Sequence, residues 1–350
     1  MKTPFKKITA AVLLLVGVSS CAPKPEPVGL VLSGGGAKGA YEIGVWKALC
    51  ETGVADRIQV FSGTSVGAIN ATLFASVRDA DVCVRLWREA AGSVFTCNTN
   101  AVRDAVQTVR DDYESVTRDF RKDKRPGEGL TAGEKVVATL LVGLSSAVRL
   151  ANKADAMLQG PSNSVGLCDS SRFRDVLRRS LPARWQSRPP FVHVTALAKD
   201  SGVARSFLLN GSERDRVIDC LMASSALPGV FDSVEIDGVA YVDGGWERRG
   251  GDNVPVRPIV ERHPDVKTVI VVYLENEACV RRRVSPDEFP GVKLIEIFPS
   301  QVIGGAWGGV QGLFDLSQEK IDYLIRLGYE DAMHVLRTCG LIAVESEPFA

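Results

Sequence analysis

Ser65 lies in a five-residue segment whose pattern suits a nucleophile. The segment Gly63-Thr64-Ser65-Val66-Gly67 follows an apolar run at residues 58–61, and apolar residues at helical spacing come after it. Small residues on both sides allow a serine to occupy a sharp strand-to-helix turn with its hydroxyl exposed. The N-terminus of the helix would then favour negative charge on that hydroxyl. The pattern predicts a nucleophilic serine, although an ordinary glycine-rich turn fits the same five residues equally well.

A candidate acid follows another predicted strand much later in the chain. Residues 239–242 form a strand pattern, and Asp243-Gly244-Gly245 come directly after it. In open α/β sheets the functional side chains gather at the carboxyl ends of strands, which is where Asp243 would lie. A turn aspartate also commonly accepts hydrogen bonds from nearby backbone N–H groups, and this second interpretation stays open for an isolated Asp-Gly pair.

A serine nucleophile needs a base, and the chain contains three histidines that could serve. His193 lies inside a predicted strand, and His334 shares a predicted helix face with Glu330. Neither they nor His263 follows a glycine-rich turn, so we interpret all three as structural. His263 remains an alternative, because it follows Asp243 in the hydrolase order of serine, acid and histidine.

A further glycine-rich turn, Gly34-Gly35-Gly36-Ala37-Lys38-Gly39, follows the apolar run at residues 28–32. It matches the pattern of dinucleotide-binding turns, but the next strand ends at Phe61-Ser62 without the acidic residue that would hold a ribose. A P-loop is excluded because Ala40-Tyr41 stand where Lys-Ser/Thr is required. Consecutive glycines before a helix expose backbone N–H groups. The turn therefore predicts a site for an anion, including a transient oxyanion.

These turns require a sheet whose strands end close together. The apolar runs at 28–32 and 58–61 each precede a glycine turn and a helical pattern, at 41–49 and from residue 66 to 77. Strand, turn and helix repeated twice predict a parallel α/β sheet with crossover helices. The remaining elements are predicted as strands at 191–197, 203–209, 269–274 and 294–298, a hairpin at 234–242 and a last helix at 318–336.

Residues 98–166 interrupt this α/β pattern and are interpreted as a helical insertion. Residues 111–128 carry many charges of both signs, and 136–148 form an uncharged run of thirteen. That run is too short to span a bilayer, so it predicts a helix packed on the core. A cap or lid that touches lipid is the alternative.

The first 20 residues are typical of a secretory signal. Lys2, Lys6 and Lys7 precede an apolar run at 8–18, and small residues then lead to Cys21. Residues 18–21, Val-Ser-Ser-Cys, resemble a bacterial lipobox, which implies cleavage before Cys21 and lipid attachment to it; a plain secretory signal is the alternative. Residues 22–27 alternate with proline, so a tether of roughly 20 Å is expected between lipid and domain. Ala22 after the cysteine resembles outer-membrane lipoproteins, so a lipid-anchored location in the bacterial cell envelope is expected, at the outer membrane.

Composition limits the classes of protein that remain. The 350 residues contain 42 Lys+Arg and 42 Asp+Glu, and this absence of a basic surplus argues against a nucleic-acid binder. The length allows a substantial core, and no uncharged apolar run reaches the 18 residues that a transmembrane helix needs. A folded enzyme-sized domain over residues 28–340 is expected, followed by a tail at 341–350.

The cysteines that follow Cys21 contain no Cys-x-x-Cys pair, so no zinc or thioredoxin-type motif is predicted. An exported compartment permits disulfides, but their number is odd and at least one thiol stays unpaired within the chain. Most are interpreted as buried apolar residues. The seven are Cys50, Cys83, Cys97, Cys168, Cys220, Cys279 and Cys339.

In combination, the three motifs resemble the patatin-like phospholipases. The Gly34–Gly39 turn, the Ser65 segment and Asp243-Gly244-Gly245 occur in that family's order. The flanking residues 223–231 and 252–255 and the helix from 317 to 332 are also similar, so the resemblance covers 28 to about 337. It implies a three-layer α/β/α sandwich with a mostly parallel central sheet.

The resemblance also implies roles for individual residues. Ser65 would be the nucleophile and Asp243 its base, without a histidine, a metal or a cofactor. The amides of Gly34, Gly35 and Gly36 would form the oxyanion hole. Two departures are noted: Lys38 stands where many relatives carry Arg, and residues 246–251 add two arginines near the site. The supporting motif residues are Lys38, Gly39, Gly63, Gly67, Gly244 and Gly245.

The expected function is therefore that of a membrane-anchored serine acyl hydrolase of lipid esters, of the phospholipase A or lysophospholipase type. Its partners would be the lipid substrate and the membrane, reached through the lipidated N-terminus. Two alternatives remain at this stage. One is a non-catalytic lipid-binding lipoprotein with the same fold, and the other is a dinucleotide-binding oxidoreductase.

Overall fold

The computed structural model describes residues 25–90, 96–97, 118, 168–280, 282–303 and 315–342. The expected signal at 1–20, the lipidation site Cys21 and the apolar run at 136–148 lie outside these residues. Within the described part of the chain, no helix is both long and apolar enough to cross a membrane.

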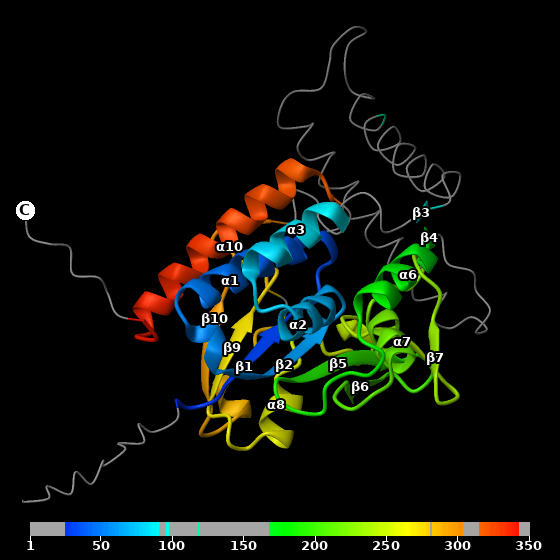
Figure 1. Cartoon of the computed structure of the whole chain (residues 1–350), viewed down its shortest axis with the longest axis horizontal. Coiled ribbons are helices and arrows are strands. Elements are labelled where there is room, and N and C mark those ends of the chain that lie inside the picture. The colour runs from blue at the N-terminus through cyan, green and yellow to red at the C-terminus, as the bar shows by residue number, and fades with distance from the viewer. Residues whose placement is uncertain are drawn as a thin grey trace, which may run out of the picture.

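One eight-stranded sheet forms the centre of the molecule (Figure 1). From one edge to the other, the strands follow the order β10, β9, β1, β2, β5, β8, β7, and β6 pairs with β5 off this path. The pairs from β10 to β5 are parallel, and those that involve β6, β7 and β8 are antiparallel. The bounds are β1 (Val28–Leu32), β2 (Ile58–Thr64), β5 (Phe191–Ala198), β6 (Val203–Leu208), β7 (Val234–Ile236), β8 (Val239–Asp243), β9 (Thr268–Val272) and β10 (Lys293–Ile297).

The strands β1 and β9 are almost entirely apolar because both of their faces are covered. All five residues of β1 and all five of β9 are buried, as expected for parallel strands between two helical layers. Leu30 and Leu32 pack into a core cluster that includes α1, whereas Val31 belongs to a second cluster that includes Ile259 of α8. The sheet therefore separates two apolar cores.

Helices cover both faces of the sheet (Figure 1). The larger layer contains α1 (Ala40–Glu51), α2 (Val66–Ser76), α3 (Ala80–Ala90), α7 (Arg214–Ser224) and α10 (Gln318–Thr338), with α6 (Ser171–Ser180) against α7. α8 (Arg257–Arg262) lies on the other face. Short 3-10 turns complete the fold: η1 (Gly36–Gly39), η2 (Val54–Arg57), η3 (Glu247–Arg249) and η4 (Pro286–Glu288).

α1 and α10 pack closely because two glycines face each other's helix. A Cβ on Gly44 would fall on the carbonyl oxygen of Ile325, and a Cβ on Gly328 would fall on that of Tyr41. The Tyr41 hydroxyl also donates a hydrogen bond to Asp331 Oδ2 at 3.0 Å. The last helix is thereby fixed against the helix that follows the first glycine turn.

The structure confirms the α/β architecture and the strands, hairpins and last helix expected from the sequence. The turn of the β7–β8 hairpin has positive φ at Asp237 (52°) and Gly238 (75°), which is the backbone that a two-residue hairpin requires. The sequence of residues 261–265, Glu-Arg-His-Pro-Asp, predicts a polar loop, and this prediction is wrong in part because helix α8 extends to Arg262. Pro258 in its first turn favours the start of this helix. Most of the insertion expected at 98–166 lies outside the described residues.

Candidate active site

β2 and β8 meet end to end along one edge of β5. β2 pairs with β5 as far as Thr64 opposite Thr195, and β8 pairs with it from Asp243 opposite Ala196. β6 occupies the other edge of β5 over the same stretch, so β2 and β8 share the remaining edge. Thr195 and Ala196 are consecutive, so Asp243 lies beside Thr64, the last residue of β2. Ser65 is the next residue in the chain.

Ser65 forms a strained turn between β2 and α2, with φ 55° and ψ −125°. A positive φ is uncommon for a residue with a Cβ and persists only where the surroundings enforce it. A Cβ on Gly63 would meet the carbonyl group of Gly67, so glycine is required at the base of the turn. Ser224 holds the turn: its hydroxyl accepts from the Ser65 N–H at 2.8 Å and donates to the Thr195 carbonyl at 2.6 Å.

The side chains of Ser65 and Asp243 are directly hydrogen-bonded. Ser65 Oγ donates to Asp243 Oδ2 at 2.6 Å, and the Gly245 N–H donates to Asp243 Oδ1 at 2.8 Å. Asp243 is only 6% exposed. Burial raises the pKa of Asp243 to about 6, and the hydrogen bonds from Ser65 and Gly245 oppose that rise. The carboxylate is therefore a stronger base than an ordinary aspartate while remaining ionised at neutral pH.

The Gly34–Gly36 turn lies next to the serine. A Cβ on Gly34 would come within 3.1 Å of Ser65 Cβ and 2.5 Å of Asn253 Oδ1. The Gly34 N–H donates to Asn253, to Oδ1 at 3.0 Å and to the backbone oxygen at 3.3 Å. Among the described residues, no hydrogen bond uses the N–H of Gly35 or Gly36. Within the described part of the chain, these two N–H groups therefore have no protein acceptor.

The supporting motif residues explain the close packing around the site. Lys38 is buried and its side chain passes over Gly35, while Gly39 adjoins Val66 at the start of α2. A Cβ on Gly67 would fall on the carbonyl oxygen of Leu32. Gly244 adjoins the Thr195 carbonyl at the end of β8, and Gly245 adjoins Asn253.

Two positioning residues, Ser224 and Asn253, received no role from the sequence. Both lie in segments that flank the motifs, 223–231 and 252–255, but neither is part of a recognised turn. Their contacts join residues more than 150 positions apart, Ser224 to Ser65 and Asn253 to Gly34. No local pattern could have found them.

Asn253→Ala is expected to lower kcat for ester hydrolysis by about 10- to 100-fold with a small change in KM, by analogy with the loss of a transition-state donor. The reason is that the Gly34 turn loses the side-chain acceptor that positions it. Steady-state kinetics on a soluble ester would measure the effect. Asn276→Ala is the control, since Asn276 bonds the Pro299 carbonyl instead. An unchanged kcat in folded Asn253→Ala would contradict a positioning role.

The histidines do not reach the serine–aspartate pair. His193 is fully buried in β5, and its Nε2 lies 2.9 Å from Nε2 of His263 at the end of α8. His334 is on the exposed face of α10. Among the described residues, the hydrogen bonds of Ser65 and Asp243 include no histidine. The geometry therefore does not support the alternative in which His263 acts as the base.

The buried histidine pair should make the protein acid-labile. Burial, followed by nearby His263 and Arg262, lowers the pKa of His193 from 6.5 to about 3. The pKa of His263 is also lowered, mainly by burial and in part by Arg262, while Asp265 opposes the shift. Below pH 6.5, His193 binds a proton in the unfolded chain but stays neutral in the folded protein. Stability should therefore fall by about 1.4 kcal/mol per pH unit below 6.5 from this residue alone.

Urea unfolding between pH 7.5 and 4.5 would measure this loss, and His193→Gln should reduce its slope. His334→Gln is the control because His334 is exposed. A slope equal to that of the wild type in His193→Gln would show that the pair is not responsible.

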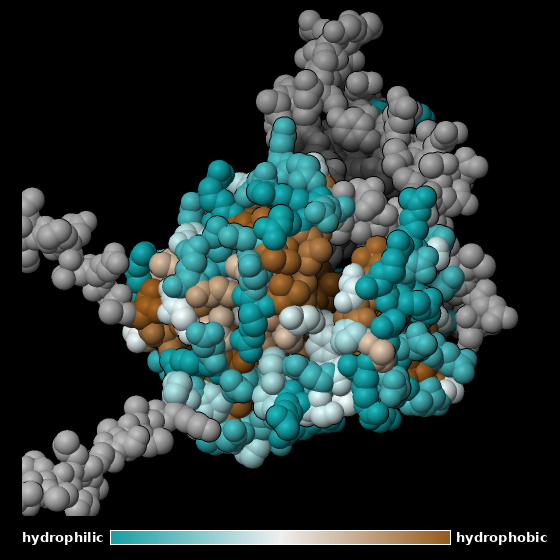
Figure 2. Space-filling model, viewed as in Figure 1, coloured by the Kyte–Doolittle hydropathy of each residue, from teal (hydrophilic) through white to brown (hydrophobic). Residues whose placement is uncertain are grey.

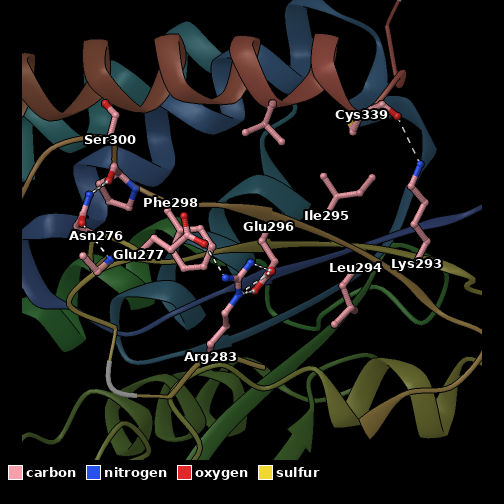
Figure 3. A pocket seen from close by; sticks show the side chains of 13 residues that line it. Asn276, Glu277, Arg283, Lys293, Leu294, Ile295, Glu296, Phe298, Ser300 and Cys339 are labelled. Atoms are coloured by element: carbon pink, nitrogen blue, oxygen red, sulfur yellow. Dashed lines mark hydrogen bonds and ion pairs between the residues drawn. The ribbon is translucent and has the colours of Figure 1, made fainter. Parts of the chain in front are cut away.

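A cavity of about 830 Å³ lies at another place, between β10, the chain after β9 and the last part of α10 (Figure 3). The charged side chains that line it interact with neighbouring protein groups. Arg283 forms ion pairs with Glu277 and Glu296, and Lys293 donates a hydrogen bond to the Cys339 carbonyl. Neither Ser65 nor Asp243 lines it. The reactive groups are thus outside this cavity.

The fold and this geometry define an α/β protein in which a serine on a strand-to-helix turn is bonded to a buried aspartate. The sequence profile described as patatin-like phospholipase matches residues 30–260, which include the Gly34 turn, Ser65 and Asp243. The chain belongs to the patatin-like phospholipase family, and the resemblance expected from the three motifs is confirmed.

Individual relatives match over shorter stretches. Lysophospholipase nte1 of Aspergillus terreus is 56% identical over 55 residues, which is 16% of this chain and 3% of that protein. Patatin-like phospholipase domain-containing protein 7 of Mus musculus is 37% identical over 71 residues, 19% of this chain and 5% of that protein. The chain thus matches only a small part of the length of these curated relatives.

Two solved structures align with most of this chain. Human GIVD cytosolic phospholipase A2 aligns with 90% of this chain and 59% of its own, at 13% identity and a TM-score of 0.43. VipD from Legionella pneumophila aligns with 90% of this chain and 67% of its own, at 15% identity and a TM-score of 0.43.

Proposed function

We propose that this protein hydrolyses the carboxylic ester bonds of lipids through a Ser65–Asp243 dyad. The observation that carries the proposal is the 2.6 Å hydrogen bond from Ser65 Oγ to the buried carboxylate of Asp243. Membership of the patatin-like phospholipase family supports a lipid ester as the substrate class.

The geometry supports a two-step acyl transfer. Asp243 accepts the Ser65 proton as Oγ attacks the ester carbonyl carbon, and the tetrahedral oxyanion accepts hydrogen bonds from the N–H groups of Gly35 and Gly36. The intermediate collapses, the ester C–O bond breaks, and Asp243 returns the proton to the leaving alcohol. Water then attacks the acyl-enzyme carbonyl with Asp243 again as base. The bond between Ser65 Oγ and the acyl carbon breaks, Asp243 returns the proton to Ser65, and the fatty acid is released. Gly34, which was also expected in the oxyanion hole, is left out because its N–H already donates a hydrogen bond to Asn253 Oδ1.

The rate should depend on pH through Asp243. Only the ionised carboxylate can accept the Ser65 proton, and burial raises the pKa of Asp243 to about 6. We expect kcat/KM to fall about tenfold per pH unit below 6 and to level off above about 7. Initial rates on p-nitrophenyl butyrate between pH 5 and 8, with circular dichroism as a check of folding, would measure the profile. A profile that is flat down to pH 5 in folded protein would contradict an aspartate base with a raised pKa.

Lysophospholipids are the substrates to test first. The curated relatives include proteins named lysophospholipases, although they match this chain over short segments. Apolar side chains are visible at the surface in the region of α2 and α3 (Figure 2), and α2, the helix that begins beside Ser65, carries the half-buried Ile69 and Leu73. An acyl chain attached to Ser65 would find apolar surface on this helix.

The experiment uses the purified full chain in mixed micelles that contain lysophosphatidylcholine or phosphatidylcholine. Release of free fatty acid, detected by mass spectrometry, together with labelling of Ser65 by a fluorophosphonate, would support the proposal. A folded protein that releases no fatty acid from any ester and takes no label would instead favour a non-catalytic lipid-binding protein. Tight binding of NAD or FAD would favour the oxidoreductase alternative.

We further propose that lipid on Cys21 anchors the protein to a membrane of the bacterial cell envelope, with the outer membrane as the expected site. The signal pattern at 1–20 and the lipobox resemblance at 18–21 support it. Two or more acyl chains at Cys21 would hold the protein stably, and the short tether would keep the folded domain close to the bilayer. Cys21→Ser should move the protein from the membrane fraction to the soluble fraction. Retention of that variant in membranes after a carbonate wash would contradict lipid anchoring.

A further inference from the structure

Two cysteines lie directly opposite each other in a small ladder apart from the main sheet. β3 (Thr96–Cys97) and β4 (Cys168–Asp169) pair in antiparallel fashion, with Cys97 opposite Cys168 and Thr96 opposite Asp169. β3 follows α3 and β4 precedes α6, so the ladder joins the two ends of the segment 98–167.

We infer that Cys97 and Cys168 form an intrachain disulfide. Opposite residues of an antiparallel pair have Cα atoms about 4.5 or 5.5 Å apart, and disulfides need Cα atoms about 4.4 to 6.8 Å apart. Opposite residues also direct their Cβ atoms to the same face of the ladder. A slip of one residue would remove this match between the Cα atoms of Cys97 and Cys168.

The other cysteines agree with a single pair. Cys50, Cys83, Cys220, Cys279 and Cys339 are free thiols. Burial raises the pKa of Cys50, Cys83 and Cys220 to about 12, which leaves these thiols unreactive at neutral pH. Removing the pair Cys97–Cys168 from the odd set after Cys21 leaves these five as thiols.

The bond requires an external oxidant. The two thiols lose two protons and two electrons as the S–S bond forms, and a disulfide of a thiol oxidase or of glutathione takes them up and becomes two thiols. An exported chain, as proposed from the signal pattern, would meet such oxidants. The bond would join the segment that follows α3 to the segment that precedes α6.

Peptide mapping of the full chain tests the inference without reference to activity. Cells that export the chain are treated with excess iodoacetamide before lysis, and the protein is digested with trypsin without reduction. Peptides 89–103 and 154–172 each contain one cysteine, Cys97 and Cys168 respectively. We expect one species with the summed mass of both peptides, which separates after dithiothreitol. Recovery of both peptides fully alkylated from unreduced protein would overturn the inference.

Single substitutions provide matched controls. Cys97→Ser should expose Cys168 to alkylation, Cys168→Ser should expose Cys97, and Cys279→Ser should leave the linked peptide intact, because Cys279 is exposed and free. A linked species found only in chains that migrate as covalent dimers without reductant would also overturn an intrachain bond. If either ladder variant fails to fold, the wild-type map alone decides the question.

Discussion

Ser65→Ala is expected to reduce the hydrolysis of lysophosphatidylcholine by at least about 10³-fold, because the hydroxyl proposed to attack the ester is removed. The Ser65 Oγ is bonded to Asp243 and lies beside the Gly34 turn, and no second nucleophile shares this arrangement in the described chain. Fatty-acid release measured under single-turnover conditions would give the loss. The fluorophosphonate label should be lost with it.

Ser76→Ala is the matched control for this variant. Ser76 ends the helix that begins after Ser65, and its hydroxyl bonds only the Thr72 carbonyl of the previous turn. Both variants should unfold cooperatively in urea, so that a lost rate reflects lost chemistry. A folded Ser65→Ala protein that keeps a tenth of the wild-type rate would assign the reaction to another residue.

Asp243→Asn is expected to lower kcat by about 10³- to 10⁴-fold while the protein stays folded. The amide has the shape of the carboxylate and can still accept from the Gly245 N–H, but it cannot take the Ser65 proton. The same substitution should remove the pH dependence near 6. Steady-state rates on a soluble ester and on micelles would measure both effects.

His263→Ala separates a dyad from a triad. We expect it to keep kcat within about twofold, since His263 contacts His193 and not the Ser65–Asp243 pair. His334→Ala should behave in the same way because the side chain is exposed on α10. A loss in folded His263→Ala as large as that in Asp243→Asn would refute the dyad.

The sequence by itself determined the local features of this protein. Glycine patterns, together with short apolar runs followed by apolar residues at helical spacing, identified the turns at Gly34 and Ser65. The strand pattern before Asp243-Gly244-Gly245 identified the third turn. Such signals are local, because a turn or a helix start depends on a few neighbouring residues. The order of the three motifs then sufficed to identify the family.

Only the tertiary structure decided how distant residues meet. Ser65 and Asp243 are hydrogen-bonded because β2 and β8 share one edge of β5, which brings together two residues about 180 positions apart in the chain. Ser224 and Asn253 act through contacts of the same kind.

The raised pKa of Asp243 and the opposition of Cys97 to Cys168 were equally invisible in the sequence. A pKa depends on burial by the whole fold, and strand register depends on which face of each strand is covered. Both are set by long-range packing, about which a residue's immediate neighbours carry little information.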